Sequence, residues 1–388
     1  MTDLLVRLFI KDSENISDPK VRQRYGLLGS ATGIAANFLL FAAKLFAGLI
    51  TGSIAITADA FNNLSDAGSS AVTLIGFKLA IHKPDREHPF GHGRIEYLSG
   101  LLVSMAILLM GVELLKSSIK QIFSPEPVMF SILSSVILAI SIAVKLMMCL
   151  FNRSLAKRIN SSAMKATSAD SLGDAIATSA VLAGSLIAKL TSVDIDGYLG
   201  LIVAFVILYA GYNAAKDTVT PLLGAKPDPE FVNDISKTVM CHSEVIGMHD
   251  LIIHDYGPGR LMISLHAEVN SNGDILVLHD AIDNIERELS KKFGCDVVIH
   301  MDPIDCDDAK TTHLRYQVSQ LAAAIDPGMT IHDLRAVTGP THTNLIFDVL
   351  LPMDSRLTPK EAKAAMEKAI TVLDGPYFAV ITVDRPYV

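Results

Sequence analysis

Six long apolar stretches dominate the first 216 residues of the chain. A helix needs about 20 apolar residues to cross a bilayer, and each stretch reaches roughly that length. The predicted helices cover residues 26–50, 53–81, 98–119, 127–151, 168–190 and 195–215. We therefore expect an all-α bundle of six transmembrane helices over residues 25–216, after a charged N-terminal tail over residues 1–24.

The second and fifth stretches differ from the others because they are rich in Ala, Gly and Ser and also carry acids. Small residues allow close helix packing in a membrane. The acidic segments read ADAFNNLSD in the second stretch and SADSLGD in the fifth. A carboxylate at membrane depth costs at least ~2.5 kcal/mol, so these acids require a function or a partner.

Each acidic segment presents two oxygen ligands four residues apart, and residues i and i+4 share one face of a helix. Asn62 and Asp66 therefore project together, and so do Asp170 and Asp174. Two such pairs on two polar helices can converge, so the sequence predicts a four-ligand site for a divalent cation.

Polar packing is the competing interpretation, with the acids paired to the intramembrane bases Lys44 and Lys145. Asp59 lies three residues before Asn62. It either borders the ligand face or lies near the far membrane surface. Asn63 points away from the pair, so we expect it to be a packing residue.

Basic residues indicate the orientation, because cytosolic segments next to spans are enriched in Lys and Arg. They are concentrated in the N-terminal tail and in the loops after the second and fourth helices. These are Arg7, Lys11, Lys20, Arg22 and Arg24, then Lys83, Arg86 and Arg94, then Arg153, Lys157, Arg158 and Lys165. We expect a multi-pass protein of the cell membrane with both termini in the cytosol.

Beyond the apolar stretches, the pattern predicts the order helix, strand, strand, helix, strand over residues 217–308. A similar order follows over residues 309–388, where IHDLRAV from Ile331 echoes MHDLIIH from Met248. The sequence therefore predicts an α+β domain that is apparently duplicated.

The second copy lacks most histidines of the first. His332 stands at the position of His249, but Asp348 replaces His266 and Thr382 replaces His300. We interpret this copy as a domain mostly without metal ligands, used for packing or dimerisation.

Composition narrows the function classes. Half of the residues are hydrophobic and the net charge is −8, which argues against nucleic-acid binding, since that needs a basic face. The four cysteines, Cys306 among them, form no C-x-x-C pair, so a zinc knuckle is not predicted. The chain has no nucleotide loop of the G-x-x-x-x-G-K type and no nucleophile beside a base, so we do not expect an enzyme.

The acidic segments and the loop sequence PDREHPFGHGRIE resemble the cation diffusion facilitator family over about residues 20–305. The resemblance implies six spans, a cytosolic ferredoxin-like domain and a homodimer. It also implies export of a divalent metal from the cytosol in exchange for protons, with Asn62, Asp66, Asp170 and Asp174 as the transport site.

The resemblance also implies a second, cytosol-facing metal site at Asp85, His88 and His92. Alternatively, these histidines only hydrogen-bond the loop. In some relatives the base at the Arg94 position pairs with an acid in the linker to the cytosolic domain. Gly224 stands at that linker position here, so this interlock is not predicted.

A regulatory metal site is implied for the first cytosolic copy, at or near a dimer interface. Its candidate ligands are His249, His266, His279, His300 and Asp302. His300 and Asp302 share one face of a strand because strand side chains alternate. The alternative is a set of solvated histidines on a sheet rim.

The ligand types indicate the metal. Zinc members of the family place a histidine in one of the two pairs, whereas this chain has one amide and three carboxylates there. Such oxygen ligands suit manganese, so we predict a Mn²⁺ exporter. A Zn²⁺ or Fe²⁺ exporter and a membrane metal sensor that transports nothing remain alternatives. Clustered carboxylates repel one another and hold protons, which metal entry would expel.

Overall fold

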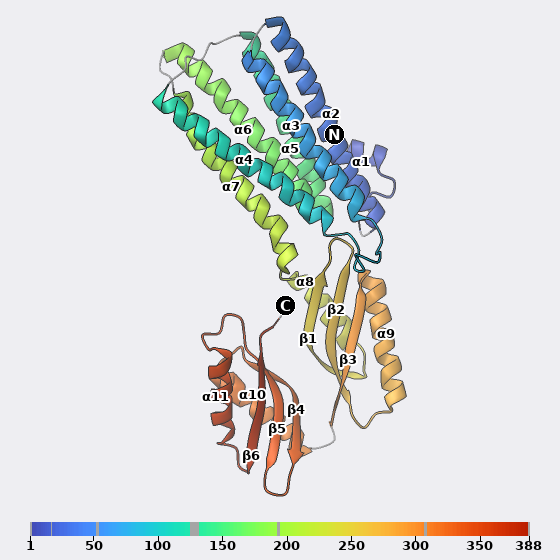
Figure 1. The fold of residues 1–388 in the computed structure, drawn as a ribbon. Coiled ribbons are helices and arrows are strands. Elements are labelled where there is room, and N and C mark those ends of the chain that lie inside the picture. The colour runs from blue at the N-terminus through green and yellow to red at the C-terminus, as the bar shows by residue number, and fades with distance from the viewer. Residues whose placement is uncertain are drawn as a thin grey trace. The chain divides into compact units, whose positions relative to one another are not determined.

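A computed structural model describes residues 2–16, 18–51, 54–124, 132–191, 195–305 and 309–386 (Figure 1). Cys306 and the start of the predicted helix 127–151 lie outside these described residues. The chain divides into two compact units. The first comprises Met1–Ala225 with the turn Asp255–Arg260, and the second comprises Lys226–His254 with Leu261–Val388.

The first unit is helical. Its helices are α1 (Thr2–Phe9), α2 (Pro19–Thr51), α3 (Ile54–Ala80), α4 (Ile95–Phe123), α5 (Ile132–Ile159), α6 (Ser162–Thr191) and α7 (Asp196–Leu223). Within the described residues, four helices are long and apolar enough to cross a membrane, namely α2, α4, α5 and α7. The acidic segments lie on the other two long helices, α3 and α6. This unit is therefore a helical transmembrane region, and the count of six spans stays a prediction.

Close helix packing in this unit depends on small residues. The main neighbours are α2 with α3, α4 with α7 and α5 with α6, while α3 also contacts α6. At the α4–α6 contact, a Cβ atom added to Gly100 would lie 2.9 Å from the Cα of Ala163, a distance that real Cβ atoms do not reach. Side chains of Ala, Gly and Ser thus let the acid-bearing helices approach their neighbours.

The N-terminal tail has more structure than the charge pattern predicted. Val6 of helix α1 and Ile10, which directly follows it, are buried in a cluster that includes Tyr25, Leu155 and Ile159. Helix α2 already begins at Pro19, where proline is favoured in a first turn. The N-terminal tail therefore packs on the helical unit through α1 and Ile10.

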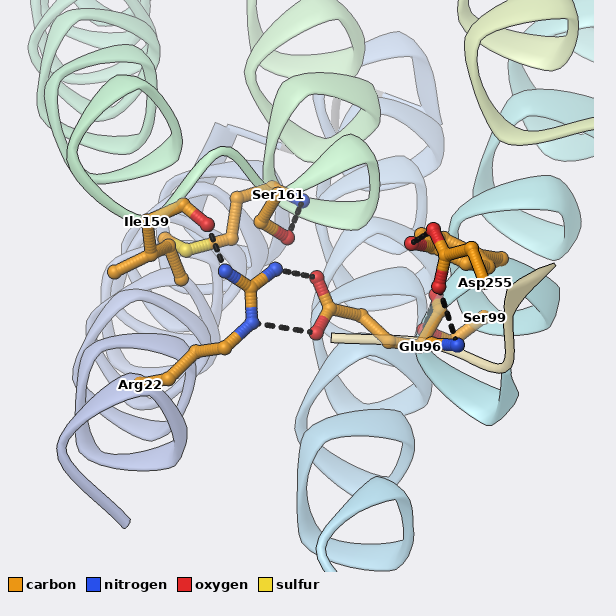
Figure 2. Close-up of polar contacts among 9 residues, drawn as sticks. Arg22, Glu96, Ser99, Ile159, Ser161 and Asp255 are labelled. Carbon is orange, nitrogen blue, oxygen red and sulfur yellow. Dashed lines mark hydrogen bonds and ion pairs between the residues drawn. The ribbon is translucent and has the colours of Figure 1, made fainter. Parts of the chain in front are cut away.

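A buried ion pair joins three helices at one end of this unit (Figure 2). Arg22 on α2 donates from Nη2 to Glu96 Oε1 at 2.8 Å and from Nε to Glu96 Oε2 at 3.2 Å. The same guanidinium donates to the backbone carbonyl of Ile159 at the end of α5. The Glu96 side chain on α4 is only 2% exposed, so its charge depends on Arg22.

The second unit contains two small sheets with helices. The first part has α8 (Pro229–Met240), β1 (Val245–Asp255), β2 (Leu261–Asn270), α9 (Ile275–Phe293) and β3 (Asp296–Ile304). The second part has α10 (Ala309–Ile325), β4 (Thr330–Thr338), β5 (Thr343–Leu350), α11 (Pro359–Ile370) and β6 (Tyr377–Asp384). The strand orders are β1-β2-β3 and β4-β5-β6, so both parts have the predicted element order. A common origin by duplication stays a prediction.

Alternation along the central strands separates the core from the polar face of each sheet. In β2 the buried side chains are Ile263, Leu265, Ala267 and Val269, and in β5 they are Leu345, Phe347 and Val349. They pack in two separate cores with the helices of their own part. His266 and Asp348 alternate with these residues, so they lie on the opposite faces.

We expect Glu96→Ala to lower the melting temperature of the purified protein in detergent. Removing one partner of a buried ion pair leaves the other charge uncompensated, at a cost of about 3–5 kcal/mol. The double variant Arg22→Met/Glu96→Met removes both charges and should recover most of that loss. Equal melting temperatures for the single and double variants would contradict the view that the uncompensated Arg22 charge causes the loss.

Candidate functional site

Three carboxylates converge between α3 and α6. Asp66 lies on α3, while Asp170 and Asp174 lie one turn apart on α6. One oxygen from each of the three can be chosen so that all lie within 4.8 Å of one another. The i, i+4 spacing explains why the two acids of α6 share a face. The contact of α3 with α6 brings Asp66 to them.

Lys145 on α5 lies against the same carboxylates. Its Nζ donates to Asp66 Oδ2 at 2.6 Å and to Asp174 Oδ2 at 2.5 Å, and its side chain is 3% exposed. The competing interpretation of polar packing expected such a pairing for Lys145. The structure contains both features, because the lysine bridges the two helices whose acids form the predicted site.

The fourth predicted ligand has a different environment. Asn62 lies one turn before Asp66 and its side chain is exposed. Asp59 pairs with Lys44, whose Nζ lies 2.8 Å from Asp59 Oδ2. Asn63 is buried and donates from Nδ2 to the Asp59 backbone carbonyl at 2.9 Å, which agrees with the packing role we expected for it.

The loop after α3 brings its three predicted ligands together. Asp85 Oδ1 lies 3.5 Å from His88 Nδ1, and Asp85 Oδ2 lies 3.4 Å from His92 Nε2. The backbone N–H groups of Glu87 and His88 donate to Asp85 Oδ1 at 3.0 and 2.7 Å. The His88 bond does most to hold the pKa of Asp85 below its usual value. The carboxylate is thus ionised and fixed between two imidazoles.

Arg94, at the end of this loop, contacts the turn Asp255–Arg260 within the first unit. Its Nη2 donates to the Asp255 backbone carbonyl at 2.7 Å, and its guanidinium lies 4.7 Å from the Tyr256 ring centre. The Tyr97 hydroxyl donates to Asp255 Oδ2 at 3.0 Å. Asp255 is also drawn in Figure 2. Arg94 therefore has its acceptor, the Asp255 carbonyl, at the end of β1.

The cytosolic candidates gather on the polar face of the first sheet. Asp302 Oδ2 lies 2.8 Å from His266 Nδ1 and 3.2 Å from His249 Nε2, while its Oδ1 lies 3.3 Å from His300 Nε2. His279 is exposed on α9 with Asp283 Oδ1 3.6 Å away. The structure thus groups three of the four predicted histidines around the Asp302 carboxylate and places His279 elsewhere.

Two further residues join this group that we did not predict. Asp250 Oδ2 lies 3.4 Å from His249 Nδ1, and its Oδ1 lies 3.8 Å from His332 Nε2 on β4. The rings of His249 and His332 are stacked with centres 4.2 Å apart. The sequence feature that could have indicated both residues is the His-Asp dipeptide, which occurs at corresponding positions of the two copies.

The charges around His332 come from acids of both parts, namely Asp250 and Glu268 of the first part and Asp348 of the second. Burial, followed by the neighbouring His249, lowers the pKa of the His332 imidazole. Burial also raises the pKa of Asp384, and the carboxylates of Asp348 and Asp250 act in the same direction. A neutral imidazole and several carboxylates therefore lie close together, which is the composition of a cation site.

Both units of the chain contain regions that match known protein families. Residues 30–223 match the cation efflux transmembrane domain, and residues 227–304 match the cytoplasmic domain of cation efflux proteins. The chain is 30% identical to the cation-efflux pump FieF of Klebsiella pneumoniae over 73% of this chain and 95% of that protein. It is 28% identical to the manganese efflux system protein MneS of Bacillus subtilis over 72% of this chain and 96% of that protein.

We expect Lys145→Met to strengthen equilibrium binding of Mn²⁺ by about tenfold, or ~1.4 kcal/mol, as measured by titration of the detergent-solubilised protein. The ammonium occupies carboxylate oxygens that a metal ion needs, so its removal ends this competition. The matched control is Lys44→Met, which removes the lysine that pairs with Asp59 and should change the affinity much less, because Lys44 makes no hydrogen bond to the cluster in the described residues. Weaker binding in Lys145→Met would mean that the lysine organises the site instead of competing for it.

Proposed function

Because this chain belongs to the cation diffusion facilitator family, we propose that it exports Mn²⁺ from the cytosol in exchange for protons. As a member of this family of transporters, the chain is a membrane cation efflux transporter. The choice of Mn²⁺ and its exchange for protons are what we propose.

The cluster of Asp66, Asp170 and Asp174 is the observation that carries this proposal. All three ligands are carboxylates, and Asn62, the fourth candidate, would add an amide oxygen one turn away. Carboxylate and carbonyl oxygens suit manganese, whereas imidazole suits zinc. The similarity to a protein named for manganese efflux supports the same metal.

Proton exchange follows from charge repulsion in this cluster. Three carboxylates within 4.8 Å of one another favour the bound proton, because adjacent negative charges disfavour ionisation. A metal ion that enters the cluster competes with these protons and with Lys145. Protons that arrive from the opposite side would in turn weaken metal binding.

The rest of the proposal concerns topology and regulation. We propose six spans, α2 to α7, with both termini in the cytosol and with the acids of α3 and α6 in the bilayer interior. The group around Asp302 and the loop group around Asp85 would then face the cytosol and respond to its metal concentration. The chain would act as a homodimer.

Two alternatives compete with this proposal. The first is export of Zn²⁺ or Fe²⁺, because an oxygen-ligand site also accepts these ions. The second is a membrane metal sensor that binds metal without transport. The transport experiment separates all three, because it measures which ions move and whether any ion moves.

Metal uptake into proteoliposomes under a pH gradient should be fastest with Mn²⁺ when Mn²⁺, Zn²⁺, Fe²⁺ and Mg²⁺ are compared. Asp66→Ala should abolish uptake because it removes a ligand of the transport site. His266→Ala should still transport, with a changed dependence on metal concentration. Faster Zn²⁺ than Mn²⁺ uptake would overturn the metal assignment, and no uptake of any ion would support the sensor.

Asn62→His should shift the preference of transport toward Zn²⁺, because an imidazole would replace an amide oxygen. We expect the ratio of Zn²⁺ to Mn²⁺ uptake rates to rise by about tenfold, or ~1.4 kcal/mol of relative stabilisation. Asn63→His is the matched control, since Asn63 is buried and bonded to the Asp59 carbonyl. An unchanged ratio in Asn62→His would show that Asn62 does not contact the metal.

A further inference from the structure

A His-Asp pair with an unusual backbone occurs in both parts of the second unit. Asp250 and Asp333 directly follow His249 and His332, and each aspartate has φ of +51°. This left-handed conformation is uncommon for residues other than glycine, although Asp tolerates it better than most. The ladder between β4 and β5 shifts register between His332 and Arg335, so the strand is irregular where His332 lies.

The two imidazoles are buried against each other. The side chain of His249 is 9% exposed and that of His332 is 8% exposed. Their ring planes are inclined by 28°, with centres 4.2 Å apart. Both nitrogens of both rings are buried, and none makes a hydrogen bond within the part of the chain that the structure describes. Burial of polar nitrogens without partners is unfavourable, so this arrangement calls for a ligand.

Carboxylates surround the unpartnered nitrogens at distances suited to shared coordination. The Asp250 carboxylate lies near both rings, 3.4 Å from His249 Nδ1 and 3.8 Å from His332 Nε2. One ligand atom from each of these three residues can be chosen within 4.8 Å of the others. The charges of Asp348 and Asp384 also act in this region. A cation at this point would satisfy both rings and offset the acids.

We propose that His249, Asp250 and His332 form a metal site that is built jointly by the two parts of the second unit. We name these three residues the joint site. Two imidazoles and a carboxylate suit an ion of the zinc type better than one of the calcium type. Asp348 or a water molecule would complete the coordination, since zinc takes four ligands.

The joint site is distinct from the group around Asp302, although both include His249. His266, His300 and Asp302 all come from the first sheet, whereas His332 comes from the second. A metal in the joint site would therefore fasten residues 309–388 to the first part. Under this proposal, the second part takes part in metal binding, in contrast to our interpretation of it from the sequence.

Equilibrium dialysis of the full-length protein against Zn²⁺ tests the joint site. We expect His332→Ala to lose one bound Zn²⁺ per chain, or to bind it at least about tenfold more weakly, as loss of a metal-binding residue does. His342→Ala is the matched control, because His342 is a half-buried histidine of the same part whose Nδ1 lies 2.9 Å from the Thr341 hydroxyl. The control should bind as much Zn²⁺ as the native chain.

A second variant keeps the test valid if His332→Ala misfolds. Asp250→Asn keeps a side chain that tolerates the left-handed backbone but removes the negative charge, so it should also bind Zn²⁺ more weakly. Zn²⁺ should raise the melting temperature of the native chain more than that of either variant, since a ligand stabilises the state that binds it. Equal Zn²⁺ stoichiometry and affinity in native, His332→Ala and Asp250→Asn proteins would overturn the proposal. These experiments measure Zn²⁺ binding and thermal stability, so their results do not depend on whether the protein transports Mn²⁺.

Discussion

The ion pairs of Lys145 with Asp66 and Asp174 determine how closely the helices of the first unit must pack. Carboxylates at membrane depth are costly unless a cation compensates them. Lys145 supplies one positive charge to two acids on two different helices, α3 and α6, from a third helix, α5. The helices must therefore pack closely enough for one ammonium group to reach both acids. Their Ala, Gly and Ser residues permit that approach.

The compensation by Lys145 is incomplete, and this has a functional consequence. Asp170 lies within the same cluster and its side chain is buried, so three acids share one ammonium group. The remaining negative charge can be offset by protons or by a divalent metal, and the two compete for the same oxygens. The Lys145 ammonium makes the metal-free cluster less negative, but it also occupies oxygens of Asp66 and Asp174. Under the proposed function, a metal ion would therefore have to displace the ammonium from these oxygens before it could bind all three carboxylates.

Helical periodicity was sufficient to predict part of this site. The spacing of Asp170 and Asp174 placed them on one face, and the matching segments on two polar helices indicated that Asp66 would join them. The partner of the acids could not be chosen from the sequence, because Lys44 and Lys145 both lie on apolar helices and helix neighbours are decided by packing. The structure assigns Lys145 to the cluster and Lys44 to Asp59. Asn62 shares the predicted face, yet its exposure could not be foreseen from spacing alone.

In the second unit, too, local sequence patterns predicted some neighbours in the site, whereas contacts between distant segments could not be predicted. Strand alternation placed His300 and Asp302 on one face, and the register of β2 with β3 sets His266 directly beside His300. The contact of His249 with His332 depends on how two separately folded sheets meet, and no local pattern encodes that. The repeated His-Asp dipeptide was visible in the sequence, but its meaning required the position of β4.

Burial of His249 against His332 within one chain also restricts how two copies of the chain could associate. Both rings are more than nine-tenths buried, so this corner of the sheet faces is not free to meet a second chain. The same faces carry exposed residues on β3 and β6. These are Val298 (62% exposed), Phe378 (60%) and Val380 (51%), with the side chain of His300 at 66%. A homodimer that used the sheet faces would cover these residues beside the joint site, so the second part of this unit would contribute to the dimer interface.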